Sequence, residues 1–281
     1  MSANGWKNLF QRQVALPSEH GSWVFVLSPL LTGLLVGRSL RAQSLLVILT
    51  VMAGFLMRQP VTVLVKVLSG RRPDKEWTPA LFWSMVYALL AALGLGALLW
   101  QGNPYILWYI LPALPVVAWQ MWLVRRRTER RQLALEVAGS GVLAMAAPAA
   151  YWTAVGHYAA VGWLLWACLW LQTSGAIVYT YLLLDQRRLK QVPAVPQRLR
   201  MAVPALAVNF SLLLAALLTA AAGWIPPWSL AAYALQCVEV LRGAARPKPQ
   251  ARPNTIGLRM LILTCLVTGI LIYAFLIWKG G

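Results

Sequence analysis

Arg58 and Lys66 lie inside one long apolar stretch of the sequence, where a charged side chain needs an explanation. Lys66 is near the end of the stretch, so its long side chain can reach a polar surface. Arg58 lies about two turns earlier, next to Pro60, where a kink would let polar groups face an interior cavity. A guanidinium there suits bidentate recognition of phosphate or carboxylate. We predict a ligand-binding role for Arg58, with a structural ion pair to Glu19 or Glu239 as the alternative.

The seven acidic residues lie at or near the ends of apolar segments, on the side that also carries the basic loops. Carboxylates at membrane depth are costly unless they are paired or hydrated, so this placement indicates a hydrated cavity at that face. Interfacial salt bridges are the favoured interpretation for Glu76 and Glu129, which basic loop residues flank. For Glu19 and Glu239 the two interpretations are balanced. The acidic residues that suggest the cavity are Glu19, Glu136, Asp185 and Glu239.

The most motif-like stretch is residues 16–23, which read Leu-Pro-Ser-Glu-His-Gly-Ser-Trp. Glu19 would complement the dipole of a helix N-terminus, a histidine such as His20 titrates near neutral pH, and Gly21 permits close approach of a neighbour. Each is an ordinary helix-start residue when taken singly. Their concentration beside acidic residues predicts a cavity lined by Glu19, His20, Arg58 and Asp185.

Membrane-spanning helices are the elements that must position these residues. The chain is 60% hydrophobic and only 11% charged, which predicts an all-α integral membrane protein with a single polytopic transmembrane domain over residues 1–281. A spanning helix needs about 20 apolar residues. The nine segments that meet this requirement are residues 22–36, 44–67, 79–100, 104–124, 133–155, 158–184, 202–222, 224–241 and 258–278.

Basic residues cluster in every second gap between these segments, at residues 68–78, 125–132, 186–201 and 242–257. Only Arg38 and Arg41 interrupt this alternation. Because basic loops stay on the cytoplasmic side, we predict a cytoplasmic N-terminus and an extracytoplasmic C-terminus. The net charge of +18 is then explained by topology and contact with membrane lipids, and it does not indicate a nucleic-acid partner.

The three cysteines, Cys168, Cys237 and Cys265, lie within apolar segments and have no spacing typical of a disulfide framework or a zinc site. No glycine-rich phosphate loop or metal-spaced histidine cluster occurs in the sequence. The chemistry of soluble enzymes is therefore excluded. Tryptophan is abundant and could stack a quinone or pigment, although aromatic belts and helix packing explain it more simply.

Three short motifs give the chain a family resemblance: residues 16–23, the Arg-Arg-Arg-Thr-Glu-Arg-Arg-Gln of residues 125–132, and the Arg-Pro-Asn-Thr-Ile-Gly-Leu-Arg of residues 252–259. Together they resemble the YwiC-like family of bacterial membrane proteins over most of the chain. The resemblance implies a multi-pass protein of the bacterial cytoplasmic (inner) membrane, and it implies no particular biochemical role.

The polar loops after the second and sixth segments are similarly placed to those of the UbiA superfamily of intramembrane prenyltransferases. They span residues 66–75 and 184–190. That superfamily joins a prenyl diphosphate to an aromatic or tetrapyrrole acceptor, and its Asp-rich loops hold magnesium. Here the loops offer only Asp74 and Asp185, so magnesium is expected at these two residues only if the chain is prenyltransferase-like.

Three functions remain open from the sequence. The first is a divergent prenyltransferase whose cationic side chains neutralise the diphosphate of an isoprenoid. The second is a non-catalytic subunit that binds a lipid, quinone or pigment or joins a larger membrane complex, and the third is a transporter, although no inverted repeat is evident. The predicted ligand-binding residues are Glu19, His20, Arg58, Lys66, Arg71, Arg72, Asp185 and Glu239.

Overall fold

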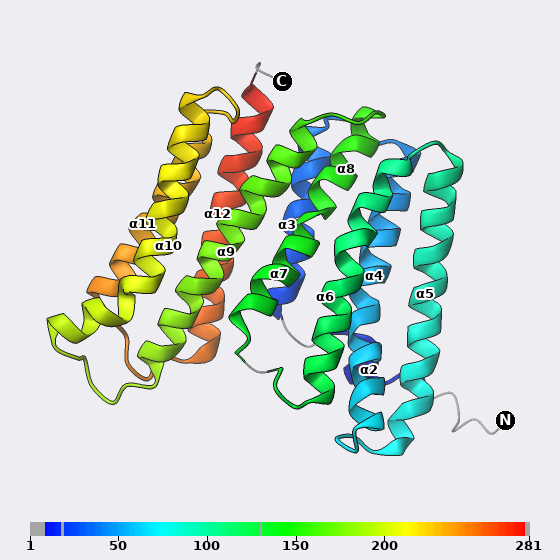
Figure 1. The fold of residues 1–281 in the computed structure, drawn as a ribbon, viewed down its shortest axis with the longest axis horizontal. Coiled ribbons are helices and arrows are strands. Elements are labelled where there is room, and N and C mark those ends of the chain that lie inside the picture. Colours follow the sequence, from blue (N-terminus) through cyan, green and yellow to red (C-terminus); the bar gives the residue numbers. More distant parts are fainter. Residues whose placement is uncertain (1–8, 18–19, 130, 279–281) are drawn as a thin grey trace. The chain divides into compact units, whose positions relative to one another are not determined.

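The computed structural model describes residues 9–17, 20–129 and 131–278 (Figure 1). All regular elements in these ranges are helices. Seven helical segments in the described ranges are long and apolar enough to cross a bilayer. The fold is therefore that of an all-α multi-pass membrane protein, as the sequence predicts.

The chain forms two compact units, Met1–Ala159 and Ala160–Gly281. That they act as a single domain stays a prediction. The helices of the first unit are α2 (Arg12–Ala15), α3 (His20–Val36), α4 (Ala42–Leu68), η1 (Asp74–Glu76), α5 (Trp77–Trp100), η2 (Pro104–Ile106), α6 (Leu107–Arg125), α7 (Leu133–Ala144) and α8 (Ala146–Val155). Those of the second are α9 (Val161–Arg187), α10 (Val195–Ala221), α11 (Ser229–Ala245) and α12 (Pro253–Ile277).

Each predicted segment corresponds to a helix or to a pair of consecutive helices. The count of nine crossings is not confirmed, because α3 and α11 have only 17 residues each. A helix of that length spans about 26 Å, less than the roughly 30 Å of a bilayer hydrocarbon core. The predicted orientation of the termini likewise stays a prediction.

The predicted segment 133–155 is divided into α7 and α8 at Met145. Pro148 explains the position of this break. Its ring would clash with the carbonyl of Ala144, four residues earlier, and it has no N–H to continue the helical hydrogen bonds. Pro60 does not divide its helix, since α4 continues through it from Ala42 to Leu68.

Helices α3 and α8 pack closely because Gly33 of α3 and Gly37, the residue after its end, face alanines of α8. A Cβ atom on Gly33 would collide with the carbonyl oxygen of Ala147 and would lie 2.8 Å from the Cβ of Ala150. One turn further along, a Cβ on Gly37 would collide with Ala154. Small residues four apart allow such backbone contact between membrane helices, where dispersion takes the place of hydrophobic burial.

A short segment at the N-terminus, residues 9–16, docks against α4 and α5 (Figure 1). Its Val14 side chain is fully buried in a cluster with Val63, Val67 and Ala80. Apolar packing therefore holds the segment against the two longer helices.

Side chains of α5 also donate hydrogen bonds to backbone carbonyl groups of this docked segment. Tyr87 donates its hydroxyl to the carbonyl oxygen of Ala15 at 3.1 Å, and Trp83 donates its indole N–H to Leu9 at 2.9 Å. Tyr87 lies ten residues into α5, about 15 Å along the helix axis. A carbonyl group packed inside the protein needs a hydrogen-bond donor, and these two side chains supply one to Ala15 and one to Leu9.

Candidate functional site

The predicted site residues fall in both units of the structure. Glu19 lies outside the described residues, as does the side chain of His20. Arg58 is a half-buried residue of α4, whereas Asp185 and Glu239 belong to the second unit. The cavity proposed from Glu19, His20, Arg58 and Asp185 therefore stays a prediction.

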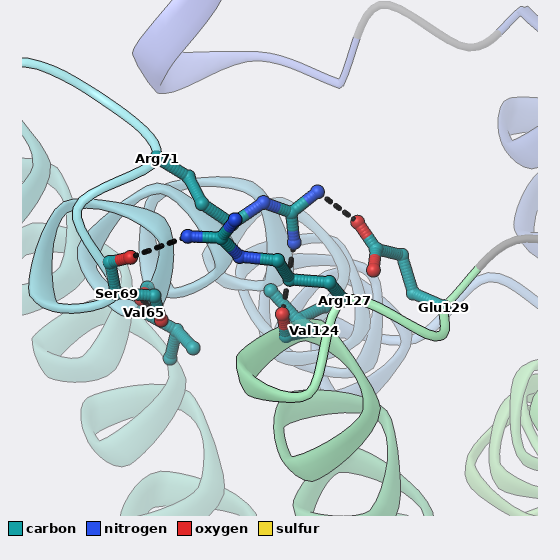
Figure 2. Close-up of polar contacts among 6 residues, drawn as sticks. All are labelled: Val65, Ser69, Arg71, Val124, Arg127 and Glu129. Atoms are coloured by element: carbon teal, nitrogen blue, oxygen red, sulfur yellow. Dashed lines mark hydrogen bonds and ion pairs between the residues drawn. The ribbon is translucent and has the colours of Figure 1, made fainter.

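Arg71 lies in the turn after α4, and its side chain binds the C-terminal end of α6 (Figure 2). Its guanidinium donates to the carbonyl oxygen of Val124 at 2.8 Å and forms an ion pair with Glu129 at 2.6 Å. About a fifth of each charged side chain is exposed, at 22% and 19%. Arg71 therefore joins the α4–α5 turn to the loop after α6.

Arg127 makes the opposite connection, from the end of α6 back to α4 (Figure 2). It donates to the carbonyl oxygen of Ser69 at 3.4 Å. Val124 and Ser69 both lie at the C-terminal end of a helix, where carbonyl groups lack the usual partner four residues later and the helix dipole favours a cation. Arg71, which follows α4, thus binds the end of α6, and Arg127, which follows α6, binds the end of α4. We call this pair of contacts the arginine clasp.

The remaining residues of this turn are also paired. Arg72 forms an ion pair with Glu76 at 2.7 Å, one helical turn away, and Glu76 is buried. The prediction of salt bridges for Glu76 and Glu129 is confirmed. Consequently both Arg71 and Arg72, which the sequence suggested as ligands for a diphosphate, already have carboxylate partners.

Next to the clasp lies a groove of about 740 Å³ between the ends of α4 and α6. We call it the α4–α6 groove. The residues that line it are Val65, Leu68, Ser69, Met121, Trp122, Arg125 and Arg127. Its volume is in the range of small-molecule sites, and it combines an apolar lining with two guanidinium groups at one end.

The electrostatics at this end of the groove favour an anion. Arg126 lies over the ring of Trp122, with its guanidinium carbon 4.4 Å from the ring centroid. The ion pair with Arg71 lowers the pKa of Glu129 below its ordinary value, so this carboxylate stays charged and compensates Arg71. Among the described residues, Arg125 and Arg127 have no carboxylate partner within ion-pairing distance.

The described residues contain no group of three histidine, cysteine or acidic side chains that could hold a metal ion. Asp74 is exposed at the start of η1 in the first unit, and Asp185 lies near the end of α9 in the second. Magnesium bound by these two residues stays a prediction. Lys66 is half-buried on α4, close to the turn that carries Arg71.

In the second unit, Glu239 pairs with Arg259 of α12. The backbone carbonyl of Glu239 accepts a hydrogen bond from the hydroxyl of Tyr179 at 3.0 Å. The guanidinium of Arg259 also lies 5.8 Å from the ring centroid of Tyr179. Glu239 therefore takes part in a contact that joins α9, α11 and α12. This contact agrees with the salt-bridge interpretation of Glu239.

A buried cluster of three amide side chains also lies in the second unit. Gln172 donates to the side chain of Gln236 at 2.9 Å, and Gln236 donates to that of Asn209 at 2.7 Å. Asn209 donates in turn to the carbonyl oxygen of Gly175 at 3.2 Å. The three side chains are at most 2% exposed and join α9, α10 and α11. Sequence analysis missed this cluster, although three amides inside apolar segments are a visible signal.

A second groove, of about 430 Å³, lies on α10 and α11 and has only apolar lining residues. They are Phe210, Leu213, Leu214, Leu217, Leu230, Ala231 and Ala234. This groove contains no polar group that could orient a ligand, so the α4–α6 groove is the stronger candidate site.

The comparisons with known proteins support the first of the two resemblances. The model of the YwiC-like protein family matches residues 16–151, just under half of the chain. The match includes the motifs at residues 16–23 and 125–132 but not the one at 252–259, so it covers less of the chain than the sequence motifs suggested. No curated protein matches the chain significantly. No solved structure does either, and the resemblance to the UbiA superfamily gains no support.

The matched residues include both α4 and α6, and with them the arginine clasp and the whole lining of the α4–α6 groove. Over residues 16–151 the chain is therefore similar to the YwiC-like protein family.

Proposed function

We propose that this protein binds an anionic membrane amphiphile in the α4–α6 groove without transforming it. The observation that carries the proposal is the composition of the groove, in which two arginines with no carboxylate partner among the described residues lie beside an apolar surface. Phosphate-bearing lipids have the complementary structure, with an anionic headgroup on a hydrocarbon tail. Basic pockets between membrane helices are a recurrent way to bind such headgroups.

The two parts of the groove would hold the two parts of the ligand. Arg125 and Arg127 lie at or just beyond the last residue of α6, where a lipid headgroup meets water. Guanidinium groups bind phosphate oxygens in a bidentate manner. Val65 and Met121 lie further inside their helices, so they would contact the hydrocarbon next to the headgroup.

A prenyltransferase activity is the second candidate, since a prenyl diphosphate has the same division into an anionic head and an apolar tail. Catalysis would further require that the site stabilise the departing diphosphate. Arg71 and Arg72 are occupied by Glu129 and Glu76, which leaves them unsuited to that task without rearrangement. Non-catalytic binding is therefore the function that the geometry supports best.

The test is lipid retention by the full-length protein, measured by native mass spectrometry after purification in a mild detergent and addition of dioleoyl phosphatidic acid. The Arg125→Gln/Arg127→Gln variant should retain much less of the added lipid than the unmodified protein. A matched control is Arg246→Gln/Lys248→Gln, which removes two exposed positive charges from the loop after α11. Equal loss of lipid in both variants would show that net charge, and not the groove, holds the lipid.

A second measurement separates binding from catalysis. Affinities for a prenyl diphosphate and for the corresponding prenyl alcohol are compared on the same protein. A site that assists departure of the diphosphate must gain binding energy from it, so equal affinities would exclude the prenyltransferase. Product formation with an aromatic acceptor would instead contradict the non-catalytic function.

A further inference from the structure

The charge pattern around the α4–α6 groove also bears on the headgroup that it would select, and this inference rests on the proposed function. Two arginines of the arginine clasp region, Arg71 and Arg126, have partners within the protein. Arg71 is compensated by Glu129, and Arg126 lies over the ring of Trp122. Arg125 and Arg127 remain, both exposed, with no carboxylate partner in the described part of the chain.

We infer that the groove prefers an amphiphile with a terminal phosphate monoester to one with a phosphate diester. A terminal phosphate carries a charge of about −1.5 to −2 at neutral pH and exposes three acceptor oxygens. A diester carries one charge and has two free oxygens, because its other oxygens are bonded to carbon. Only the monoester therefore has enough negative charge and enough acceptor oxygens to pair with two guanidinium groups.

The available donors support this preference. A guanidinium has five N–H donors in a fixed planar arrangement. Arg127 uses a terminal nitrogen for the Ser69 carbonyl oxygen, and Arg125 makes no hydrogen bond to the described residues. The clasp therefore positions Arg127 at the end of the groove without using up its ability to bind phosphate.

Two natural kinds of molecule have this chemistry, namely phosphatidic acid and an isoprenoid monophosphate. They share the terminal phosphate and differ in the tail, which is two acyl chains in the first and one branched chain in the second. Comparison of both with phosphatidylglycerol, a diester, tests the headgroup. Comparison of the two monoesters with each other identifies the tail.

The experiment measures affinities of the full-length protein, in nanodiscs of phosphatidylcholine, for dioleoyl phosphatidic acid, geranylgeranyl monophosphate and dioleoyl phosphatidylglycerol. At pH 7.5 the preferred monoester should bind about threefold to fivefold more tightly than the diester, as expected for one additional exposed ion pair. Arg125→Gln should abolish this preference, whereas Arg246→Gln should leave it unchanged.

The pH dependence gives an independent readout. Since the second pKa of a phosphate monoester is about 6, affinity for the monoester should rise between pH 5.5 and 7.5, while affinity for phosphatidylglycerol stays constant. Among the described residues, the charged groups around the groove are Lys66, Arg71, Arg125, Arg126, Arg127 and Glu129. Arginine does not titrate in this range, and the lowered pKa keeps Glu129 ionised throughout.

Two outcomes would contradict the headgroup preference or the groove as the binding site. If phosphatidylglycerol and both monoesters bind equally at pH 7.5, and Arg125→Gln/Arg127→Gln weakens all three, the inference about the headgroup is wrong and the proposed function stands. If that double variant weakens none of them, the groove is not the binding site and both proposals fail.

Discussion

Arg71 and Glu129 form an ion pair at 2.6 Å that connects two loops 58 residues apart in the sequence. Arg71 also donates to the Val124 carbonyl oxygen, so one guanidinium fixes both the end of α6 and the loop that follows it. The position of Arg125 and Arg127 at the groove depends on this connection, because both lie between Val124 and Glu129 in the sequence.

Glu129→Gln should destabilise the protein by about 1–3 kcal/mol, because it removes the charge partner of a largely buried guanidinium. The measurement is thermal unfolding in detergent, followed by tryptophan fluorescence. Asp74→Asn is the matched control, since it removes an exposed carboxylate from the same unit. An equal shift in the two variants would show that the ion pair contributes nothing specific.

The same ion pair should make stability depend on pH in the acid range. Because the folded protein lowers the pKa of Glu129 below the ordinary value of 4.5, the stabilisation is present above that pH and is lost as pH falls below it. The unfolding temperatures of the unmodified protein and Glu129→Gln should therefore differ by a constant amount from pH 6 to 8 and converge towards pH 3. A difference that persists unchanged at pH 3 would contradict this assignment.

Gly33→Ala should destabilise the first unit by about 1–3 kcal/mol, since the added methyl group collides with the backbone of α8 at Ala147. Gly54→Ala is the control, because a Cβ on Gly54 of α4 meets no atom within 4 Å. That control should be neutral or slightly stabilising, as alanine favours helix over glycine. Similar unfolding temperatures for the two variants would show that α3 and α8 do not pack as described.

Gln236→Leu should cost about 2 kcal/mol, because it breaks hydrogen bonds to both Gln172 and Asn209 and leaves their amides unsatisfied. Gly175→Ala should act in the same direction, since its Cβ would lie 2.5 Å from the side-chain oxygen of Asn209. Thr219→Val, whose hydroxyl bonds only to carbonyls of its own helix, is the control. Unfolding in detergent, compared across the three variants, tests whether the amide cluster stabilises the second unit.

Tyr87→Phe should loosen the docked segment of residues 9–16, because it removes the hydroxyl that donates to Ala15. The expected cost is about 1 kcal/mol. Trypsin cleavage after Arg12, which is exposed on α2, should become faster in this variant. Tyr273→Phe changes an exposed tyrosine of α12 and should leave the cleavage rate unaltered. No change in rate for Tyr87→Phe would mean that packing alone holds the segment.

The helical segments could be predicted because long apolar runs leave the backbone no alternative to helix in a membrane. The pairs of Glu76 and Glu129 followed from their basic neighbours in the sequence. The α4–α6 groove could not be foreseen, since it exists only where two helix ends distant in sequence come together. Arg125 and Arg127 were accordingly interpreted as determinants of topology, which any basic loop provides equally well.

Two other features escaped prediction for different physical reasons. The amides of Gln172, Asn209 and Gln236 are visible inside apolar segments, but their pairing depends on how three helices distant in sequence pack together. The docked N-terminal segment is too short to meet any length criterion for a membrane helix, and its position depends on Trp83 and Tyr87, about 70 residues later in the chain.

The docking of residues 9–16 against α5 has a consequence for the order of assembly. Residues 9–16 are synthesised well before Trp83 and Tyr87, the groups of α5 that receive them. The segment of residues 9–16 therefore cannot dock until α5 has been made. A bulky group fused next to this segment would interfere with the completion of the first unit and not with the insertion of its helices.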